Sequence, residues 1–426
     1  MSSGNLPFGF SPFGGGEGGN PDDLSGKIPL FAELQKLLSW SGGPVNWDLA
    51  RQLSLSALAS EHRRITAEER REVEEAIRLA DLWLNEATDL PSGVAAAEAW
   101  TRVEWIERTQ AAWSTLCDPV AARVVSAMSS ALPEQARAAG VAGPLAGVMN
   151  QFGGLMFGAQ VGQGLAEMAK EVLSSTDIGL PLGPAGVAVL LPENVAGFGA
   201  GLERPPEEVR LYLALREAAH HRLFGHVPWL RQRVLDTVEG YARGIVVDMS
   251  ALERAMADLD PTNPESLQSA LAGGMFEPQD TPEQQAALRR LETLLALIEG
   301  WVDTVVAAAA ADRMPGAAAL REALRRRRAS GGPAEETFST LVGLELRPRR
   351  LREAAALWWA VTERHGITQR DGVWAHPDLL PDTQDLDDPL GFAEKVGADP
   401  LAELTGEPNP AGPTDEEDPP AGQLGS

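Results

Sequence analysis

Cysteine is almost absent from this chain, and its scarcity narrows the chemistry available to the protein. Cys117 is the only cysteine among 426 residues. A single cysteine excludes an intrachain disulfide framework and a zinc site built from several thiolates. No histidine or basic residue lies near Cys117 in the sequence, so we expect a small buried side chain there. A metal site in this chain would have to use histidine and carboxylate ligands.

Basic residues are also in the minority. The chain has 36 Lys and Arg residues against 61 Asp and Glu residues, which gives a net charge of −25. This balance argues against unassisted binding to nucleic acid or to an anionic membrane surface. A peptide or protein substrate is compatible with it.

Long uninterrupted apolar runs and a secretory leader are both missing from the sequence. Residues Met1–Asn20 have neither a basic start nor a continuous apolar centre, as a signal peptide would. The apolar stretch Gly143–Leu173 is interrupted by polar side chains such as Asn150 and Gln160, and it falls short of the roughly 18 apolar residues of a membrane span. We therefore expect a cytoplasmic protein.

The remaining sequence predicts a mainly α-helical protein with a small β element and two disordered ends. Residues 1–25 form a Gly/Phe-rich tail, residues 26–395 a mostly helical domain, and residues 396–426 an acidic, proline-rich tail. Capping residues and turn signals predict a series of helices. Their ranges are 44–58, 66–87, 92–116, 119–137, 143–173, 207–226, 230–247, 250–259, 264–272, 283–311, 316–329 and 349–365.

Two local patterns predict how this domain packs. Gly154, Gly158 and Gly162 recur every four residues and indicate a glycine face that lets another helix approach closely. Val187–Leu191 is a short β-favouring run between Pro and Gly residues, which predicts a strand at a sheet edge. We expect it beside the helix 207–226, where it could align an extended peptide by strand addition.

The helix 207–226 contains a near match to a metallopeptidase motif. Arg216-Glu217-Ala218-Ala219-His220 differs from HExxH only at its first position. In HExxH two histidines four residues apart bind zinc on one helix face, and the glutamate activates the metal-bound water. Arginine keeps its proton and has no lone pair for a metal, so Arg216 cannot replace the histidine ligand.

Further imidazoles and carboxylates could join such a site. His221 lies four residues after Glu217 and can share its helix face, whereas His226 belongs to the end of the helix. Glu299 and Asp303 lie four residues apart on the otherwise apolar helix 283–311. Buried carboxylates are costly unless they are paired or bound to a metal.

Three segments together resemble the bacterial zincin-like metallopeptidase family. They are REAAHHRLFGHVPWLR, LIEGWVDTVV and LELRPRRLREAAALWWAVTERHGI, and the resemblance extends from about Val45 to Gly391. It implies a zincin-like fold and zinc-dependent peptide hydrolysis by metal-activated water. By the same resemblance, His220 and Glu299 would be zinc ligands and Glu217 the general base.

Arg216 leaves two interpretations open. It could form an ion pair with Glu299 or Asp303 in place of the metal charge, in a catalytically inactive interaction or scaffold protein. Alternatively, His221 or His226 could enter the zinc coordination sphere with Arg216 beside it. For the function of the protein as a whole, hydrolysis of a small-molecule amide is a third interpretation.

Two other groups have simpler interpretations. The basic run Arg325–Arg328 is typical of a solvated helix end. Trp358 and Trp359 are expected in the core because large aromatic side chains supply packing area.

Overall fold

The computed structural model describes residues 42–61, 63–130, 142–243, 282–329 and 350–396. Both predicted tails lie outside the described residues, apart from Val396 at the start of the second. The helices predicted at 250–259 and 264–272 also lie outside them.

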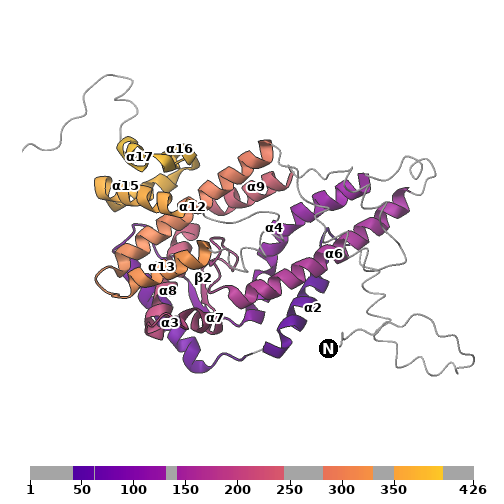
Figure 1. Ribbon diagram of the computed structural model, residues 1–426, viewed down its shortest axis with the longest axis horizontal. Helices are drawn as coiled ribbons and strands as arrows, with labels where there is room; N and C mark the ends of the chain where they lie inside the picture. Colours follow the sequence, from indigo (N-terminus) through magenta and orange to yellow (C-terminus); the bar gives the residue numbers. More distant parts are fainter. Residues whose placement is uncertain (1–41, 62, 131–141, 244–281, 330–349, 397–426) are drawn as a thin grey trace, which may run out of the picture. The chain divides into compact units, whose positions relative to one another are not determined.

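Helices dominate the described chain, and a small sheet is embedded among them (Figure 1). This confirms the mainly α fold with a small β element. The sheet has two parallel strands, β1 (Ala96–Ala99) and β2 (Val187–Leu190), with Ala96 opposite Val187. The α-helices are α2 (Trp47–Leu58), α3 (Ala67–Leu84), α4 (Arg102–Ser130), α6 (Ala142–Glu171), α7 (Pro192–Gly199), α8 (Pro206–His226), α9 (Leu230–Arg243), α12 (Pro282–Ala310), α13 (Ala317–Ala329), α15 (Leu351–Gly372), α16 (Thr383–Asp387) and α17 (Pro389–Lys395). Short 3-10 turns are η2 (Ala59–Glu61), η3 (Val373–Ala375) and η4 (Pro377–Leu379).

Local capping chemistry starts several of these helices. The side chain of Asn46 accepts a hydrogen bond from the backbone N–H of Leu49 and opens α2. Thr66 and Glu69 form a reciprocal capping box at the start of α3. These signals are why the sequence predicted both helices close to their observed starts.

The predicted helix 92–116 is wrong in its first part. Ala96–Ala99 form strand β1, and α4 begins only at Arg102 and continues through Pro119 to Ser130. The backbone N–H groups of Ala95 and Ala96 both donate to the carbonyl of Gly186, which follows about ninety residues later in the chain. Pairing with a distant segment therefore overrides the helix preference of alanine.

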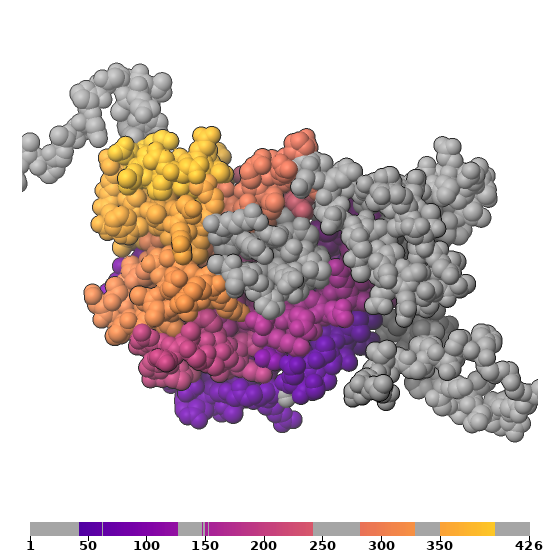
Figure 2. All heavy atoms as spheres, viewed as in Figure 1, coloured from indigo at the N-terminus to yellow at the C-terminus, as the bar shows by residue number. Residues whose placement is uncertain are grey.

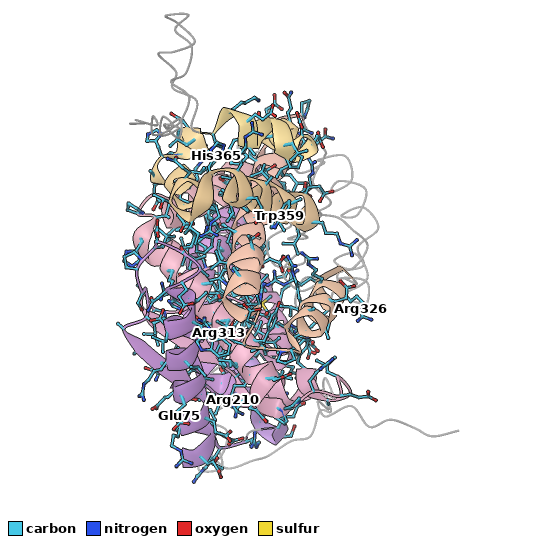
Figure 3. All side chains as sticks on the ribbon, turned by 90° about the vertical axis from the view of Figure 1, so that its left-hand side faces the viewer. Glu75, Arg210, Arg313, Arg326, Trp359 and His365 are labelled. Carbon is cyan, nitrogen blue, oxygen red and sulfur yellow. The ribbon has the colours of Figure 1, made fainter. Side chains whose placement is uncertain are left out.

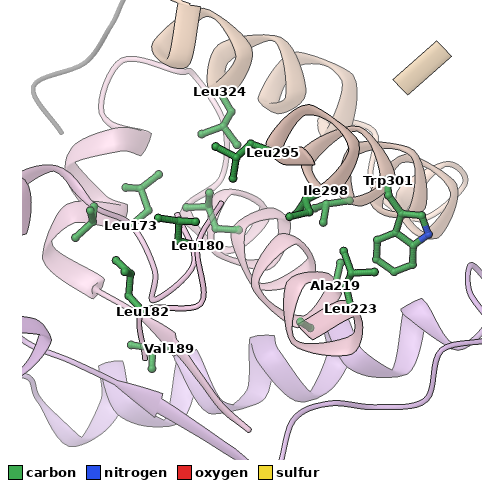
Figure 4. Close-up of a cluster of buried hydrophobic side chains, with 14 of the residues drawn as sticks. Leu173, Leu180, Leu182, Val189, Ala219, Leu223, Leu295, Ile298, Trp301 and Leu324 are labelled. Carbon is green, nitrogen blue, oxygen red and sulfur yellow. The ribbon is translucent and has the colours of Figure 1, made fainter. Parts of the chain in front are cut away.

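Helices α8 and α12 form the centre of the core. From Tyr212 to Leu223 every residue of α8 is buried, because α3, α12 and β2 surround it. Figure 4 shows Ala219 and Leu223 of α8 near Ile298 and Trp301 of α12, with Leu324 of α13 above Leu295. Among the described residues, α12 is the one helix long and apolar enough to cross a membrane, but 89% of that window is buried inside the protein. Its burial identifies α12 as a core helix.

The two tryptophans of α15 differ in their surroundings. Trp358 is fully buried, and its Nε1 donates to the carbonyl of Leu297 at 2.9 Å. Trp359 is 59% exposed, so its predicted core position is wrong. The two residues follow one another on a helix with only one face against the core, and the second points outward (Figure 3).

The glycine face of α6 is confirmed. A Cβ atom at Gly158 would lie 2.6 Å from the carbonyl oxygen of Asn46, and one at Gly162 would lie 2.6 Å from that of Ala50. Helix α2 therefore packs directly on the glycine face, backbone against backbone.

This close contact generates a stability prediction. We expect Gly162→Ala to destabilise the protein by about 1–3 kcal/mol, because the added methyl group forces α2 away from α6. Gly147→Ala is the matched control, since nothing lies within 4 Å of a Cβ at Gly147. The control should be neutral or stabilising by up to about 1 kcal/mol through helix propensity. Urea midpoints of the two variants measure the difference, and equal midpoints would contradict the packing described here.

Candidate functional site

The residues of the HExxH-like segment are divided between two faces of α8. Arg216 and His220 lie four residues apart and face α12, where both contact Glu299. Glu217 and His221 face the turn at 174–176 and strand β2. The segment therefore serves two different buried polar clusters.

The first cluster surrounds Glu299. Its Oε2 pairs with the guanidinium groups of both Arg216 and Arg328, and its Oε1 lies 3.0 Å from Nε2 of His220. The side chains of Glu299 and His220 are each 2% exposed. Three helices, α8, α12 and α13, therefore meet at one buried carboxylate.

His220 uses both of its ring nitrogens in this cluster. Nδ1 lies 2.8 Å from the carbonyl oxygen of Arg216, and Nε2 faces Glu299. Both ring nitrogens of His220 are therefore engaged by protein atoms.

The charges around Glu299 decide its ionisation. Burial by itself would raise the pKa of the carboxyl group, but Arg328, Arg216 and His220 together hold it well below its usual value. Glu299 is therefore a buried carboxylate compensated by arginine.

Asp303, one turn further along α12, is compensated in the same way. It accepts hydrogen bonds from Nε of Arg321 at 2.8 Å and from Nη2 of Arg325 at 2.6 Å, and its side chain is 2% exposed. Asp303 therefore pairs with two arginines of α13 and does not contact Arg216.

The prediction of a solvated basic run at Arg325–Arg328 is wrong for three of its four members. Arg325 pairs with Asp303, Arg328 pairs with Glu299, and Arg327 contacts Asp177 at 3.2 Å. Only Arg326 points to solvent, on the outer side of α13, with its side chain 74% exposed (Figure 3). The orange segment that includes α13 forms part of the molecular surface in Figure 2.

A sequence signal for these contacts exists. Arg321, Arg325 and Arg328 follow a spacing of four and three residues, which places them on one helix face. Glu299 and Asp303 share a face of α12 by the same rule. The basic face of α13 and the acidic face of α12 could therefore have been paired from the sequence. The unbroken run of four arginines obscured the spacing on which this pairing depends.

The second cluster surrounds Glu217, which is fully buried. Its Oε1 accepts from the Ser175 hydroxyl at 2.5 Å and from the Val189 backbone N–H at 3.0 Å, and lies 3.3 Å from Nε2 of His221. Its Oε2 accepts from both the hydroxyl and the backbone N–H of Thr176. Burial would raise the pKa of Glu217, but the contacts with His221, Ser175 and Thr176 lower it to about 2.

Glu217 also closes the open side of strand β2, and the position of the strand beside α8 is confirmed. Alternate N–H groups of the strand point away from β1. Those of Val187, Val189 and Leu191 donate to the Pro184 carbonyl, the Glu217 carboxylate and the Leu173 carbonyl. The strand edge proposed for peptide alignment is therefore already occupied by the protein itself.

His226 lies at the exposed end of α8. Its Nε2 lies 3.0 Å from the carbonyl oxygen of Ser92. Neither His226 nor His221 contacts Glu299 in the part of the chain that the structure describes.

The residues at Glu299 do not fit a zinc ion as they stand. Zinc needs several deprotonated ligands with lone pairs directed at one point. Here one carboxylate is surrounded by two guanidinium groups and a histidine whose nitrogens are both engaged. Within the described ranges, no three His, Cys, Asp or Glu residues converge as a metal-binding group.

The ionisation of Glu217 predicts an acid-sensitive contribution to stability. Its folded pKa of about 2 lies below the ordinary value of 4.5, so the contribution is complete above pH 4.5 and is lost as the pH falls toward 2. The shift corresponds to about 3 kcal/mol. Urea unfolding across this range should show Glu217→Gln less stable than the wild type near neutrality, with the difference shrinking toward pH 2. Glu75→Gln on the exposed surface should follow the wild type, and a constant difference for Glu217→Gln would contradict the assignment.

Because arginines neutralise the buried Glu299, variants within the run Arg325–Arg328 should differ in stability. Arg328→Gln removes one of two cations from a buried carboxylate and should cost about 2–3 kcal/mol. Arg326→Gln, two residues earlier and exposed, should change the free energy of unfolding by less than about 0.5 kcal/mol. Urea denaturation of both variants tests the assignment, and equal losses would show that Arg328 does not stabilise the buried site.

Comparison with known proteins agrees with this fold. No curated protein sequence matches the chain. A solved structure of 21% sequence identity, "a putative hydrolase with a novel fold" from Chloroflexus aurantiacus, superposes with a TM-score of 0.58. The match covers 83% of this chain and 99% of that one, and at this identity it establishes the shared fold. The model of the zincin-like metallopeptidases matches residues 45–393. The chain belongs to the zincin-like metallopeptidase family.

Proposed function

We propose that this protein is a zinc-independent member of its family that binds a partner without hydrolysing a peptide bond. The observation that carries the proposal is the pairing of Glu299 with both Arg216 and Arg328. Two guanidinium groups supply positive charge where the family resemblance implied a metal ion. A cation already held at the carboxylate disfavours a second, divalent one by charge repulsion.

The surroundings of Glu217 support the same proposal. A general base works best with a pKa near the operating pH and must reach the proton that it removes. Glu217 has a pKa of about 2 and accepts hydrogen bonds from the 174–176 turn, β2 and His221. We assign it a positioning role, in which it joins α8 to the turn and the strand.

Zinc-dependent peptide hydrolysis is the second candidate, and family membership favours it. His220 and Glu299 would be ligands, His221 a third ligand, and Glu217 the base. That arrangement would require Arg216 and Arg328 to leave Glu299, and His221 to leave Glu217. Each of these movements breaks a contact that is buried in the structure.

For partners and location, we propose a cytoplasmic protein that binds peptide or protein and neither nucleic acid nor membrane. The net charge of −25 supports the exclusion of nucleic acid and of anionic membrane surfaces as partners.

Calorimetric titration of zinc into metal-free protein tests the proposed function. The wild type should show no tight one-to-one binding. Arg216→His restores HExxH, and Arg216→His combined with Arg328→Gln also removes the second cation. We expect the double variant to bind zinc at least about tenfold more tightly than the wild type.

Arg326→Gln in the Arg216→His background is the matched control, because it removes an equal charge from the exposed side of α13. It should bind zinc no better than Arg216→His alone. Stoichiometric zinc binding by the wild type, accompanied by zinc-dependent cleavage of a casein substrate, would overturn the proposal in favour of the hydrolase.

A further inference from the structure

A small cavity lies beside the Glu217 cluster. Its volume is about 50 Å³. Its walls come from the turn at 175–176, the loop 181–186, the C-terminal half of α8 and the first turn of α9. A water molecule needs about 10–15 Å³ of cavity volume, so this cavity has room for a few non-hydrogen atoms.

The lining of this cavity carries no acidic side chain, although the protein as a whole has a charge of −25. Its polar side chains are Arg231, the two histidines and two hydroxyl residues. Glu217 lies behind them and is fully buried. The cavity is therefore suited to an anion and unsuited to a cation.

Most of these polar groups already have partners. The hydroxyl groups of Ser175 and Thr176 donate to Glu217, and both nitrogens of His220 are engaged. The guanidinium group of Arg231 is the cationic donor that remains in the lining of this cavity, beside the ring of His221, whose Nε2 faces Glu217.

Arg231 is the distinctive member of this set. It is partly buried, and desolvation lowers its pKa. It forms no ion pair with any residue in the described ranges. Because a partly desolvated guanidinium group without a carboxylate is unfavourable, an anion from outside the chain would stabilise it.

The other walls indicate what the anion is attached to. Pro181, Pro184 and Phe224 present apolar surface to the same cavity. A carboxylate with one or two carbon atoms combines the charge and the apolar contact within the available volume, whereas a phosphate group would place oxygen atoms against these walls.

We propose that this cavity is a binding site for a small aliphatic carboxylate, held by Arg231, with His221 in the wall of the cavity. The ligand could be a free short-chain acid or the carboxylate of a larger molecule whose remainder stays outside. The inference goes beyond the proposed function, since it does not depend on whether Glu299 binds zinc.

Nuclear magnetic resonance of the histidine ring nitrogens tests this inference in metal-free protein with chelator present. Acetate at constant ionic strength should shift the His221 signals in a saturable manner. Arg231→Gln should weaken the apparent affinity at least about tenfold, which corresponds to the loss of one charge-assisted contact. Arg233→Gln, two residues along α9, exposed and outside this cavity, is the matched control and should bind acetate like the wild type.

The anions distinguish the outcomes. Saturation by acetate or propionate without saturation by phosphate supports a carboxylate site, and protection by acetate against thermal unfolding should disappear in Arg231→Gln alone. Saturation by phosphate but not acetate, no saturable shift, or equal weakening in Arg231→Gln and Arg233→Gln would each overturn the inference. The zinc titration is unaffected by these results, so the two proposals can fail separately.

Discussion

The pairing of Glu299 with arginine is the interaction on which the centre of this protein depends. Helices α8 and α12 pack tightly, and α12 carries two buried carboxylates, Glu299 and Asp303. Charges removed from water are strongly unfavourable unless opposite charges lie beside them. Arg216 from α8 and Arg328 from α13 provide that compensation at Glu299. The same contacts that neutralise the carboxylate therefore hold three helices together.

This arrangement shows how a zincin-like fold can keep its architecture with arginine at the first motif position. A zinc ion and two guanidinium groups both supply positive charge to a buried glutamate, but they differ chemically. Zinc can polarise a carbonyl and acidify a water, whereas arginine donates hydrogen bonds in a fixed plane. The glutamate of the motif has a different environment again, because Glu217 completes the hydrogen bonds of β2 and of the turn at 174–176. These contacts join α8 to the turn and to the strand.

Several features could be predicted from sequence because they depend on neighbouring residues. The capping box at Thr66, the glycine spacing of α6 and the β-favouring run at Val187 are all local patterns, and each formed the expected element. The misassigned segments depend on distant partners. Ala96–Ala99 would be helical by propensity, but they pair with a strand about ninety residues away. Trp358 and Trp359 are neighbouring residues of the same type. Only the orientation of α15 on the core makes the Trp358 ring buried and the Trp359 ring exposed.

The sequence by itself determined the fold class, the family resemblance and the presence of an arginine that cannot bind a metal. These follow from residue type and short-range spacing, which no tertiary contact alters. The tertiary structure alone decided which charges meet. Arg216 could have paired with Glu299 or Asp303, and the arginines of α13 could have remained in water. The packing of α13 against α8 and α12 sends Arg328 to Glu299 and Arg325 to Asp303. The physical reason is that ion pairing depends on distances of a few ångströms between helices that are far apart along the chain, and spacing within one helix carries no information about those distances.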